Sequence, residues 1–549
     1  MQVSEISLSP LDILVFVLYV LCMVALVVWA SRNGGKSKRD YFLAGDKLPW
    51  WMIGGSIVAA NISSHHLVGG LGLAYTHGFV AMTIEWGAIL VGLNALLWVF
   101  MPYYLRNGFY TMPEYLQRRY GEVSRMAFGL LILLTYLFVE ISAVLYLGGI
   151  AIHAVLGIEV SRSIVVLAIV TGIYTITGGL RAVVWTEMFQ LIILMAGGVA
   201  LSAATILKIG GLSAIWATSG EWHLLLPASD PNFPWTMYLG GALCVSIFYF
   251  SSNQFIVQRV LAAKNEWHGR MGVVFTCYLK FIIPLIIIVP GLAAASLYPN
   301  LEKPDLVFPT LVKDLLPQGL IGLVMAGLIA AVMSHISGAV NSCSTIAAMD
   351  FFVPIRKWLK TRNQPTIASQ DAASQDTGND DRMVVLFGRI FAAFTILFGI
   401  VWAILFITHS EKPIFIYIFN AYGYFAPGIA TMFLMGIFWK RTTNAGAITA
   451  GLLTIPLSIG LDIVYLKLYD HAMPFQNRSG IVFWTCVVVC ILVSLATKPR
   501  TEDELKGLVW SPESLRLPKG EKPLPWYARP VVWWGLITAI VLGFYIAFP

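Results

Sequence analysis

Apolar runs of about twenty residues recur along the whole of this chain, and they constrain its fold more than any other feature. A run of that length crosses a bilayer as a helix, in which every backbone polar group finds a partner within the segment. We count fourteen such runs, at residues 11–30, 49–73, 79–104, 126–153, 163–178, 183–207, 236–258, 271–297, 316–350, 384–408, 413–439, 443–466, 480–497 and 530–548. The sequence therefore predicts an all-α polytopic membrane protein.

The composition agrees with this class and leaves little room for any other domain. Hydrophobic residues make up 58% of the 549 residues and charged residues 12%, whereas a soluble domain is about 25% charged. We predict a single transmembrane domain over residues 1–549, with cytoplasmic loops at 351–383 and 498–529. Neither loop is long enough for a further domain, and the spans contain no nucleophile–base motif or metal cluster. We therefore expect a protein that is not an enzyme.

Positive charge in the loops predicts the orientation. If the N-terminus lies outside the cytoplasm, the inside loops carry 27 Lys and Arg residues and the outside loops carry 7. Short loops rich in Lys and Arg stay on the cytoplasmic side, so we expect both termini outside. The net charge of +7 is explained by contact with anionic lipid, without a nucleic acid partner.

Several ionisable residues fall within the predicted spans. They are Glu85, Glu140 and Lys280, together with the adjacent His65 and His66. Because an ionised group at mid-membrane is costly, it normally pairs with another group or lines a polar cavity. These residues predict a polar substrate site, and thus a transporter. Two alternatives stay open: Glu85 and Lys280 form a purely structural salt bridge, and His65 packs against helices or lipid. For Glu140, Lys280 and His65 are both candidate partners.

Polar patches interrupt the second and the seventh predicted spans. The first patch reads AANISSHH at 59–66, and the second reads SIFYFSSNQ at 246–254. Both begin about ten residues into their span, and they lie five spans apart, as two inverted five-helix repeats require. A broken helix exposes carbonyl and N–H groups that can bind an ion or a sugar. The alternative is that these polar side chains only join neighbouring helices.

Short motifs spread along nearly the whole chain carry a resemblance to a known family. They are YFLAG at 41–45, AANIS at 59–63, EW at 85–86, GGLRAVVWTE at 178–187, NQFIVQR at 253–259, LK at 279–280, PG at 290–291, NS at 341–342 and FWKRTT at 438–443. In these motifs the chain resembles the sodium/solute symporter family, and within it the sodium–glucose cotransporter branch.

The resemblance implies the architecture. The family's core is a five-plus-five inverted repeat of the LeuT type, with one extra helix before it and three after it. We place the two repeats at about residues 49–258 and 236–466. The resemblance also implies a multi-pass protein of a bacterial inner membrane, with sodium as the coupling ion, and we expect it to work as a monomer.

The resemblance also assigns a sugar site to particular residues. A sugar hydroxyl both donates and accepts, so its site mixes carboxylate, ammonium, amide and imidazole groups. Glu85 would accept from hydroxyls, Lys280 would donate, and Asn61 would do both. His66 stands where the family has Gln or His. Tyr249 matches the tyrosine that forms the inner gate on the cytoplasmic side of the sugar.

Three positions of this sugar site depart from the family. Ser246 replaces an Asn one turn before the gate, Phe419 replaces a Gln of the tenth core helix, and Ala88 replaces a small polar residue after Glu-Trp. The pocket therefore offers fewer hydrogen bonds than a galactose site. It suits a deoxy, acetylated, acidic or otherwise altered sugar.

The family's sodium site maps onto the first broken helix and the eighth core helix. The resemblance assigns it the carbonyls of Ala59, Ile62 and Ala331 and the hydroxyl of Ser334. Oxygen ligands of this kind suit a hard cation. His335 stands where the family has a second serine, and imidazole titrates near neutral pH. Three interpretations follow: four oxygens suffice, His335 turns outward, or a proton replaces the ion.

A second sodium site is present in some family members. Its positions correspond to Glu187 and Ser337, with Gly338 in place of a further hydroxyl. The alternative for Glu187 is a carboxylate at the membrane end, near Arg181.

Together these features predict a sodium-coupled symporter that imports a sugar or sugar derivative by alternating access. The excess of Lys and His motivates one alternative, a symporter for an acidic sugar or another organic anion. His335 motivates another, a weakly coupled sugar uniporter or sensor.

Overall fold

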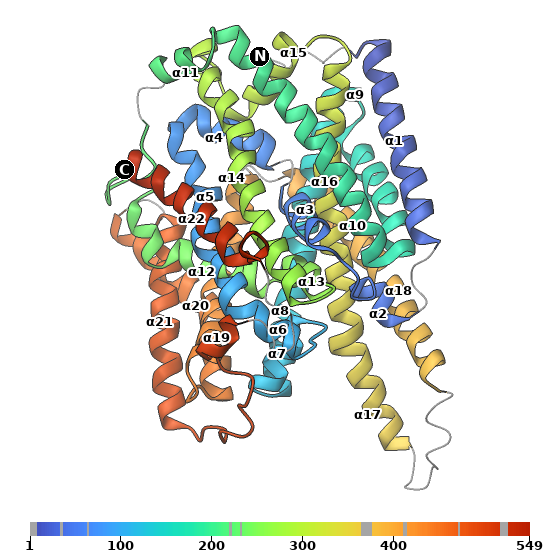
Figure 1. Cartoon of the computed structure of the whole chain (residues 1–549), viewed down its shortest axis with the longest axis vertical. Coiled ribbons are helices and arrows are strands. Elements are labelled where there is room, and N and C mark those ends of the chain that lie inside the picture. The colour runs from blue at the N-terminus through green and yellow to red at the C-terminus, as the bar shows by residue number, and fades with distance from the viewer. Residues whose placement is uncertain are drawn as a thin grey trace.

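The computed structural model describes residues 8–32, 37–62, 65–218, 222–230, 233–363, 376–409, 414–469, 473–516 and 525–549. Within these ranges the chain is a bundle of helices (Figure 1). Its first half comprises α1 (Pro10–Ser31), α2 (Lys38–Leu43), α3 (Trp50–Asn61), η1 (His65–Gly69), α4 (Gly70–His77), η2 (Gly78–Met82), α5 (Thr83–Ala88), η3 (Ile89–Leu93), η4 (Leu96–Phe100), α6 (Met101–Arg106), α7 (Met112–Arg119), α8 (Glu122–Thr135), η5 (Tyr136–Ile141), α9 (Ser142–Leu156), α10 (Val160–Ile209) and α11 (Leu212–Thr218).

The second half of the chain continues the bundle. It comprises η6 (Trp235–Leu239), α12 (Gly241–Ile247), η7 (Phe248–Ser252), α13 (Gln254–Leu261), α14 (Glu266–Leu297), η8 (Pro304–Leu306), α15 (Val307–Leu315), α16 (Leu320–Ile346), η9 (Ala347–Phe352), α17 (Val353–Asn363), α18 (Asp376–Leu405), η11 (Ile407–His409), α19 (Ile414–Phe438), α20 (Asn444–Tyr469), α21 (Phe475–Ala496), η12 (Pro512–Leu515), η13 (Trp526–Ala528) and α22 (Pro530–Ala547).

Eleven helices in the described part of the chain are long and apolar enough to cross a membrane. We predicted fourteen spans, and three differences in how the helices are divided explain the smaller number. The spans at 49–73 and 236–258 are interrupted helices, and the spans at 163–178 and 183–207 are the two parts of α10. Gly179 divides α10, with φ 59° and ψ −163°, and a Cβ there would lie 2.6 Å from the carbonyl oxygen of Tyr41.

The two interrupted helices break in the same way, as the polar patches predict. α3 ends at Asn61, and Ile62 after it is extended, with φ −80° and ψ 117°. In the seventh span, Asn253 between η7 and α13 is extended, with φ −79° and ψ 121°. Each break leaves the helix termini without some of their intrahelical hydrogen bonds. The two breaks occupy matching places in their spans, and at the second the Phe255 N–H is capped by Asn253 Oδ1 and the Tyr136 hydroxyl.

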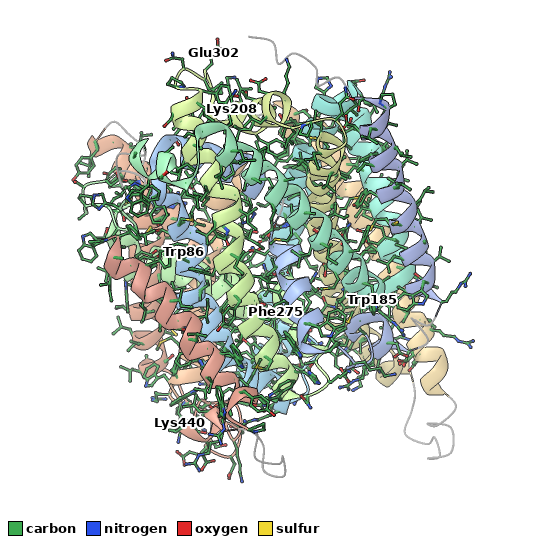
Figure 2. The ribbon with its side chains drawn as sticks, turned by 45° about the horizontal axis from the view of Figure 1, so that its top comes forward. Trp86, Trp185, Lys208, Phe275, Glu302 and Lys440 are labelled. Atoms are coloured by element: carbon green, nitrogen blue, oxygen red, sulfur yellow. The ribbon has the colours of Figure 1, made fainter. Side chains whose placement is uncertain are left out.

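The broken helices lie in the middle of the bundle. α3 packs against α10, α14 and α16. In Figure 1, α1 lies along one flank of the molecule and α21 along the opposite flank. Lys208 and Glu302 lie at one end of the molecule and Lys440 at the other, with Trp86 between them (Figure 2).

The helix before the core is fixed by one buried carboxylate. Asp12 Oδ1 accepts hydrogen bonds from the backbone N–H groups of Gly319, at 2.7 Å, and Gly322, at 2.8 Å. These N–H groups belong to the start of α16, where intrahelical partners are missing. The contact holds α1 against α16, while large apolar side chains of α1, such as Leu14 and Leu18, stay exposed.

Candidate substrate and ion sites

A cavity lies between the two broken helices and the helices around them. α3, η1, α5, α12, η7, α14, α16, α19 and α21 all contribute to its lining. Its volume is about 150 Å³, which holds roughly ten waters. A monosaccharide is of that size. The lining is mostly apolar, so the few polar groups that reach it decide what it binds.

Four predicted sugar-site residues form one hydrogen-bonded cluster in this cavity. The Lys280 ammonium donates to Glu85 and to Asn61 Oδ1, the latter at 2.5 Å. His66 Nε2 lies 3.1 Å from Glu85 Oε1. Lys280 is only 2% exposed, and a buried charge is tolerated when it is paired and hydrogen-bonded. The structure thus brings together residues from α3, η1, α5 and α14.

Tyr249, the predicted inner gate, is connected to this cluster. Asn61 Nδ2 donates to the Tyr249 hydroxyl at 3.1 Å. The Tyr249 ring packs against Phe250, Phe255 and Tyr422. This hydrogen bond joins the predicted gate residue to the Lys280 cluster.

The three departures from the family are placed only in part. Ser246 and Ala88 both line the cavity. The side chain of Phe419 lies outside the described residues, as does that of His65. Two of the three replaced positions, Ser246 and Ala88, thus border the cavity. That Phe419 does so stays a prediction.

Three of the four predicted sodium ligands lie together. The hydroxyl of Ser334 donates to the carbonyl of Ala59 at 2.7 Å and to the carbonyl of Ala331 at 3.0 Å. Ile62, whose carbonyl is the fourth predicted ligand, directly follows the end of α3. The Ala59 carbonyl of α3 thus meets the Ser334 hydroxyl and the Ala331 carbonyl of α16, and such oxygen donors suit a hard cation such as Na⁺.

His335 has a partner other than a bound ion. Its Nε2 lies 2.8 Å from Glu140 Oε2 of η5, and both side chains are buried. The ring packs on Phe255, with 4.9 Å between ring centroids, and borders the large cavity. The imidazole thus pairs with a carboxylate, and the three interpretations given above stay predictions. Of the two candidate partners for Glu140, Lys280 bonds to Glu85 and Asn61 instead, and the side chain of His65 lies outside the described residues.

Glu187 and Ser337, the possible second sodium site, are both engaged within the protein. Glu187 is fully buried, pairs with Arg259 and accepts a hydrogen bond from Ser56. The alternative placed Glu187 at the membrane end near Arg181, whereas the structure buries it fully and pairs it with Arg259. Ser337 donates to the carbonyl of Ser334 at 3.0 Å. A second ion at this place would have to compete with the Arg259 guanidinium.

Some cavity-lining residues are missing from the sequence-based prediction. Tyr422 of α19 and Phe475 and Gln476 of α21 border the same cavity as Lys280. These residues are uncharged and lie outside the two broken helices. Neither charge within a span nor a polar interruption of a span therefore predicts them. Only the packing of α19 and α21 against α12 brings them to the site.

The fold of this chain is that of known ion-coupled transporters. It resembles a Na⁺-coupled sialic acid symporter, solved in a substrate-bound outward-open state, with a TM-score of 0.75 and 22% identity, covering 90% of this chain and 99% of that chain. It also resembles Mhp1, a nucleobase-cation-symport-1 family transporter in a closed conformation, with a TM-score of 0.53 and 12% identity, over 86% of this chain and 98% of the other. This confirms the LeuT-type fold.

The sequence places the chain within one family of such transporters. Residues 41–454 match the sodium:solute symporter family. The sodium/glucose cotransporter of Vibrio parahaemolyticus is 32% identical over 92% of this chain and 93% of its own length. The sodium/glucose cotransporter 1 of Oryctolagus cuniculus is 31% identical over 91% and 81%, and the sodium/myo-inositol cotransporter of Mus musculus is 30% identical over 92% and 76%.

The chain therefore belongs to the sodium:solute symporter family. It is a multi-pass membrane transporter with sodium as its coupling ion, and it is not an enzyme.

Proposed function

We propose that this protein imports a neutral sugar or a closely related polyol together with Na⁺. The observation that carries the proposal is the cluster of Lys280, Glu85, Asn61 and His66 in a cavity of monosaccharide size. It offers donors and acceptors close together, as a sugar with adjacent hydroxyls requires. Relatives named for glucose and myo-inositol transport support the same class of substrate.

Charge balance in the cavity favours a neutral substrate over an acidic one. The Lys280 ammonium is matched by the Glu85 carboxylate, and His335 lies against the Glu140 carboxylate. An anionic substrate would need a fixed cation that is not already neutralised. Its carboxylate would also have to displace Glu85 from Lys280, leaving a buried charge without its partner.

The proposed cycle is alternating access. Na⁺ binds between the break in α3 and Ser334 of α16, and it stabilises an outward-open state. Sugar then binds at the Lys280 cluster, the outer gate closes, and movement of Tyr249 opens the path inward. One charge crossing 100 mV provides about 2.3 kcal/mol. One Na⁺ per sugar therefore concentrates the sugar roughly fiftyfold from voltage alone.

Competition experiments test the choice between neutral and acidic substrates. We expect neutral hexoses and cyclic polyols to inhibit uptake of labelled sugar, because they fit a cluster whose charges are already matched. Uronates of the same ring should inhibit at least about tenfold more weakly, since their carboxylate faces Glu85. The measurement is the half-inhibitory concentration of each competitor in cells expressing the protein. Inhibition by uronates alone would contradict the neutral-sugar proposal and favour the organic-anion alternative.

A second candidate function is weakly coupled flux, and the contact of His335 with Glu140 motivates it. A sodium site with one fewer hydroxyl ligand binds its ion less tightly. Sugar-evoked current without accumulation would support this candidate, whereas accumulation against a gradient would support the symporter.

We also propose a bacterial inner membrane location, with both termini outside the cytoplasm and the monomer as the working unit. The excess of Lys and Arg in one set of loops supports this orientation. Figure 2 places Glu302 and Lys440 at opposite ends of the molecule. In intact cells an impermeant thiol reagent should label a Lys303→Cys variant and leave Lys440→Cys unlabelled. The reverse pattern would invert the orientation.

A further inference from the structure

Gln476 borders the substrate cavity and carries a buried polar atom without a partner among the described residues. It lies in the first turn of α21 and borders the same cavity as Lys280 and Asn61. Its Oε1 is buried and has no hydrogen-bond partner among the residues that the structure describes. Buried polar atoms in native proteins are nearly always hydrogen-bonded. An acceptor that is left free beside a cavity therefore indicates a donor that arrives with a ligand.

The backbone of Gln476 is held firmly against the seventh span. A Cβ on Gly241 of α12 would lie 2.1 Å from the carbonyl oxygen of Gln476, and one on Gly240 would lie 2.6 Å from Cα of Gly480. Only glycines permit so close an approach of two helices. The cavity wall at this point is thus fixed by α21, one of the three helices after the repeat.

A buried ion pair adds to this fixation. Two residues along α21, Arg478 Nη1 lies 2.6 Å from Asp462 of α20, and Nη2 lies 2.7 Å from Asn420 Oδ1 of α19. The Arg478 guanidinium also covers the Tyr424 ring at 4.0 Å. Because these contacts fix the start of α21, the side chain of Gln476 reaches the cavity from a defined position.

Gln476 and the Lys280 cluster lie at different positions along the axis of the seventh span. Gln476 packs at the start of α12, beside Gly241, whereas Tyr249 lies eight residues further on and contacts Asn61. With a rise of 1.5 Å per residue, these backbone positions are separated by about 12 Å along the helix. The two sets of polar groups can therefore hold opposite edges of one ring-sized molecule.

We infer that Gln476 is a further substrate-binding and specificity-determining residue, whose Oε1 accepts a hydrogen bond from a sugar hydroxyl on the edge away from Lys280. This inference rests on the proposed function. Ser246 and Ala88 leave this cavity poorer in polar groups than the sugar sites it resembles, and Gln476 supplies an amide from outside the repeat. The substrate is then a polyhydroxylated ring with a free hydroxyl at that edge.

The test compares Gln476→Leu with the wild-type transporter in proteoliposomes. The probes are labelled glucose, galactose and myo-inositol, each with its monodeoxy analogues as competitors. Loss of one hydrogen bond should raise the half-saturating sugar concentration about 3- to 10-fold, while the half-saturating Na⁺ concentration stays unchanged. In the wild type, one deoxy analogue should bind more weakly than its parent sugar. In Gln476→Leu, the same analogue and its parent should bind equally well. Asn477→Leu, an adjacent amide outside the cavity lining, is the matched control and should behave as wild type.

Two outcomes are decisive, and they are distinguishable. If wild-type protein accumulates sugar and Gln476→Leu matches it in half-saturation and in deoxy discrimination, the inference is overturned while the proposed function stands. If wild-type protein itself accumulates none of the probes, the proposed function fails, and the inference with it.

A second measurement covers the case in which Gln476→Leu does not fold. In a Gln476→Cys variant, sugar should slow modification of the introduced thiol by an impermeant methanethiosulfonate reagent at least about threefold. An equal rate with and without sugar would overturn the inference.

Discussion

Replacing Lys280 with alanine is expected to lower sodium-dependent sugar uptake by about 100-fold or more. Lys280 is 2% exposed and donates to both Glu85 and Asn61. Removing one partner of a buried ion pair costs about 3–5 kcal/mol, because the other charge stays buried without compensation. The same change removes the donor that we assign to the sugar. The measurement is initial uptake of labelled sugar, normalised to the amount of transporter in the membrane.

Two further variants separate binding from folding in this experiment. Adding Glu85→Gln to Lys280→Ala removes the uncompensated charge, so we expect thermal stability in detergent to recover while uptake stays at background. Lys208→Ala changes an exposed lysine at the end of α10 and should leave uptake unchanged. Full uptake by Lys280→Ala would exclude Lys280 from the sugar site.

Replacing Ser334 with alanine is expected to raise the half-saturating Na⁺ concentration about tenfold or more. The Ser334 hydroxyl lies 2.7 Å from the Ala59 carbonyl and 3.0 Å from that of Ala331, at the proposed ion site. A hydrogen-bonding or ligand contact with a charged group is worth about 1.5–3 kcal/mol. The change leaves the Lys280 cluster intact, so half-saturation by sugar at high Na⁺ should shift little. Uptake measured over a range of Na⁺ concentrations gives both quantities.

The matched control for this variant lies on the same helix. Ser344 of α16 is also buried, but its hydroxyl donates to the Gly388 carbonyl at 2.8 Å, away from the ion site. Ser344→Ala should therefore keep the wild-type Na⁺ dependence. If Ser334→Ala keeps it as well, the sodium site lies elsewhere.

The sequence was sufficient to predict most of the fold, because the bilayer imposes few solutions on an apolar chain. The length of each run predicts a helix, and polar patches at matching positions predict the breaks at Ile62 and Asn253. The predicted spans at 163–178 and 183–207 are two helices that meet at a kink at Gly179, where glycine permits the positive φ of 59°.

Two signals predict residues of the candidate site: charge at membrane depth, and the family resemblance, which adds the uncharged Asn61, Ser246 and Tyr249. Glu85 and Lys280 stand out because ionised groups are rare at membrane depth, and the structure pairs them. The partner of Glu140 could not be predicted, because it depends on how η5 faces α16 and thus on tertiary packing. Gln476 was missed for the same reason: an uncharged amide on a helix outside the repeat gives no signal until α21 is placed against α12.

Uptake by purified protein in proteoliposomes tests the central claim most directly. Labelled sugar is offered with an inward Na⁺ gradient, with an inward H⁺ gradient, or with neither. We expect accumulation above equilibrium only with Na⁺, increased by an inside-negative potential. Equilibration without accumulation, or accumulation driven only by H⁺, would contradict sodium-coupled symport.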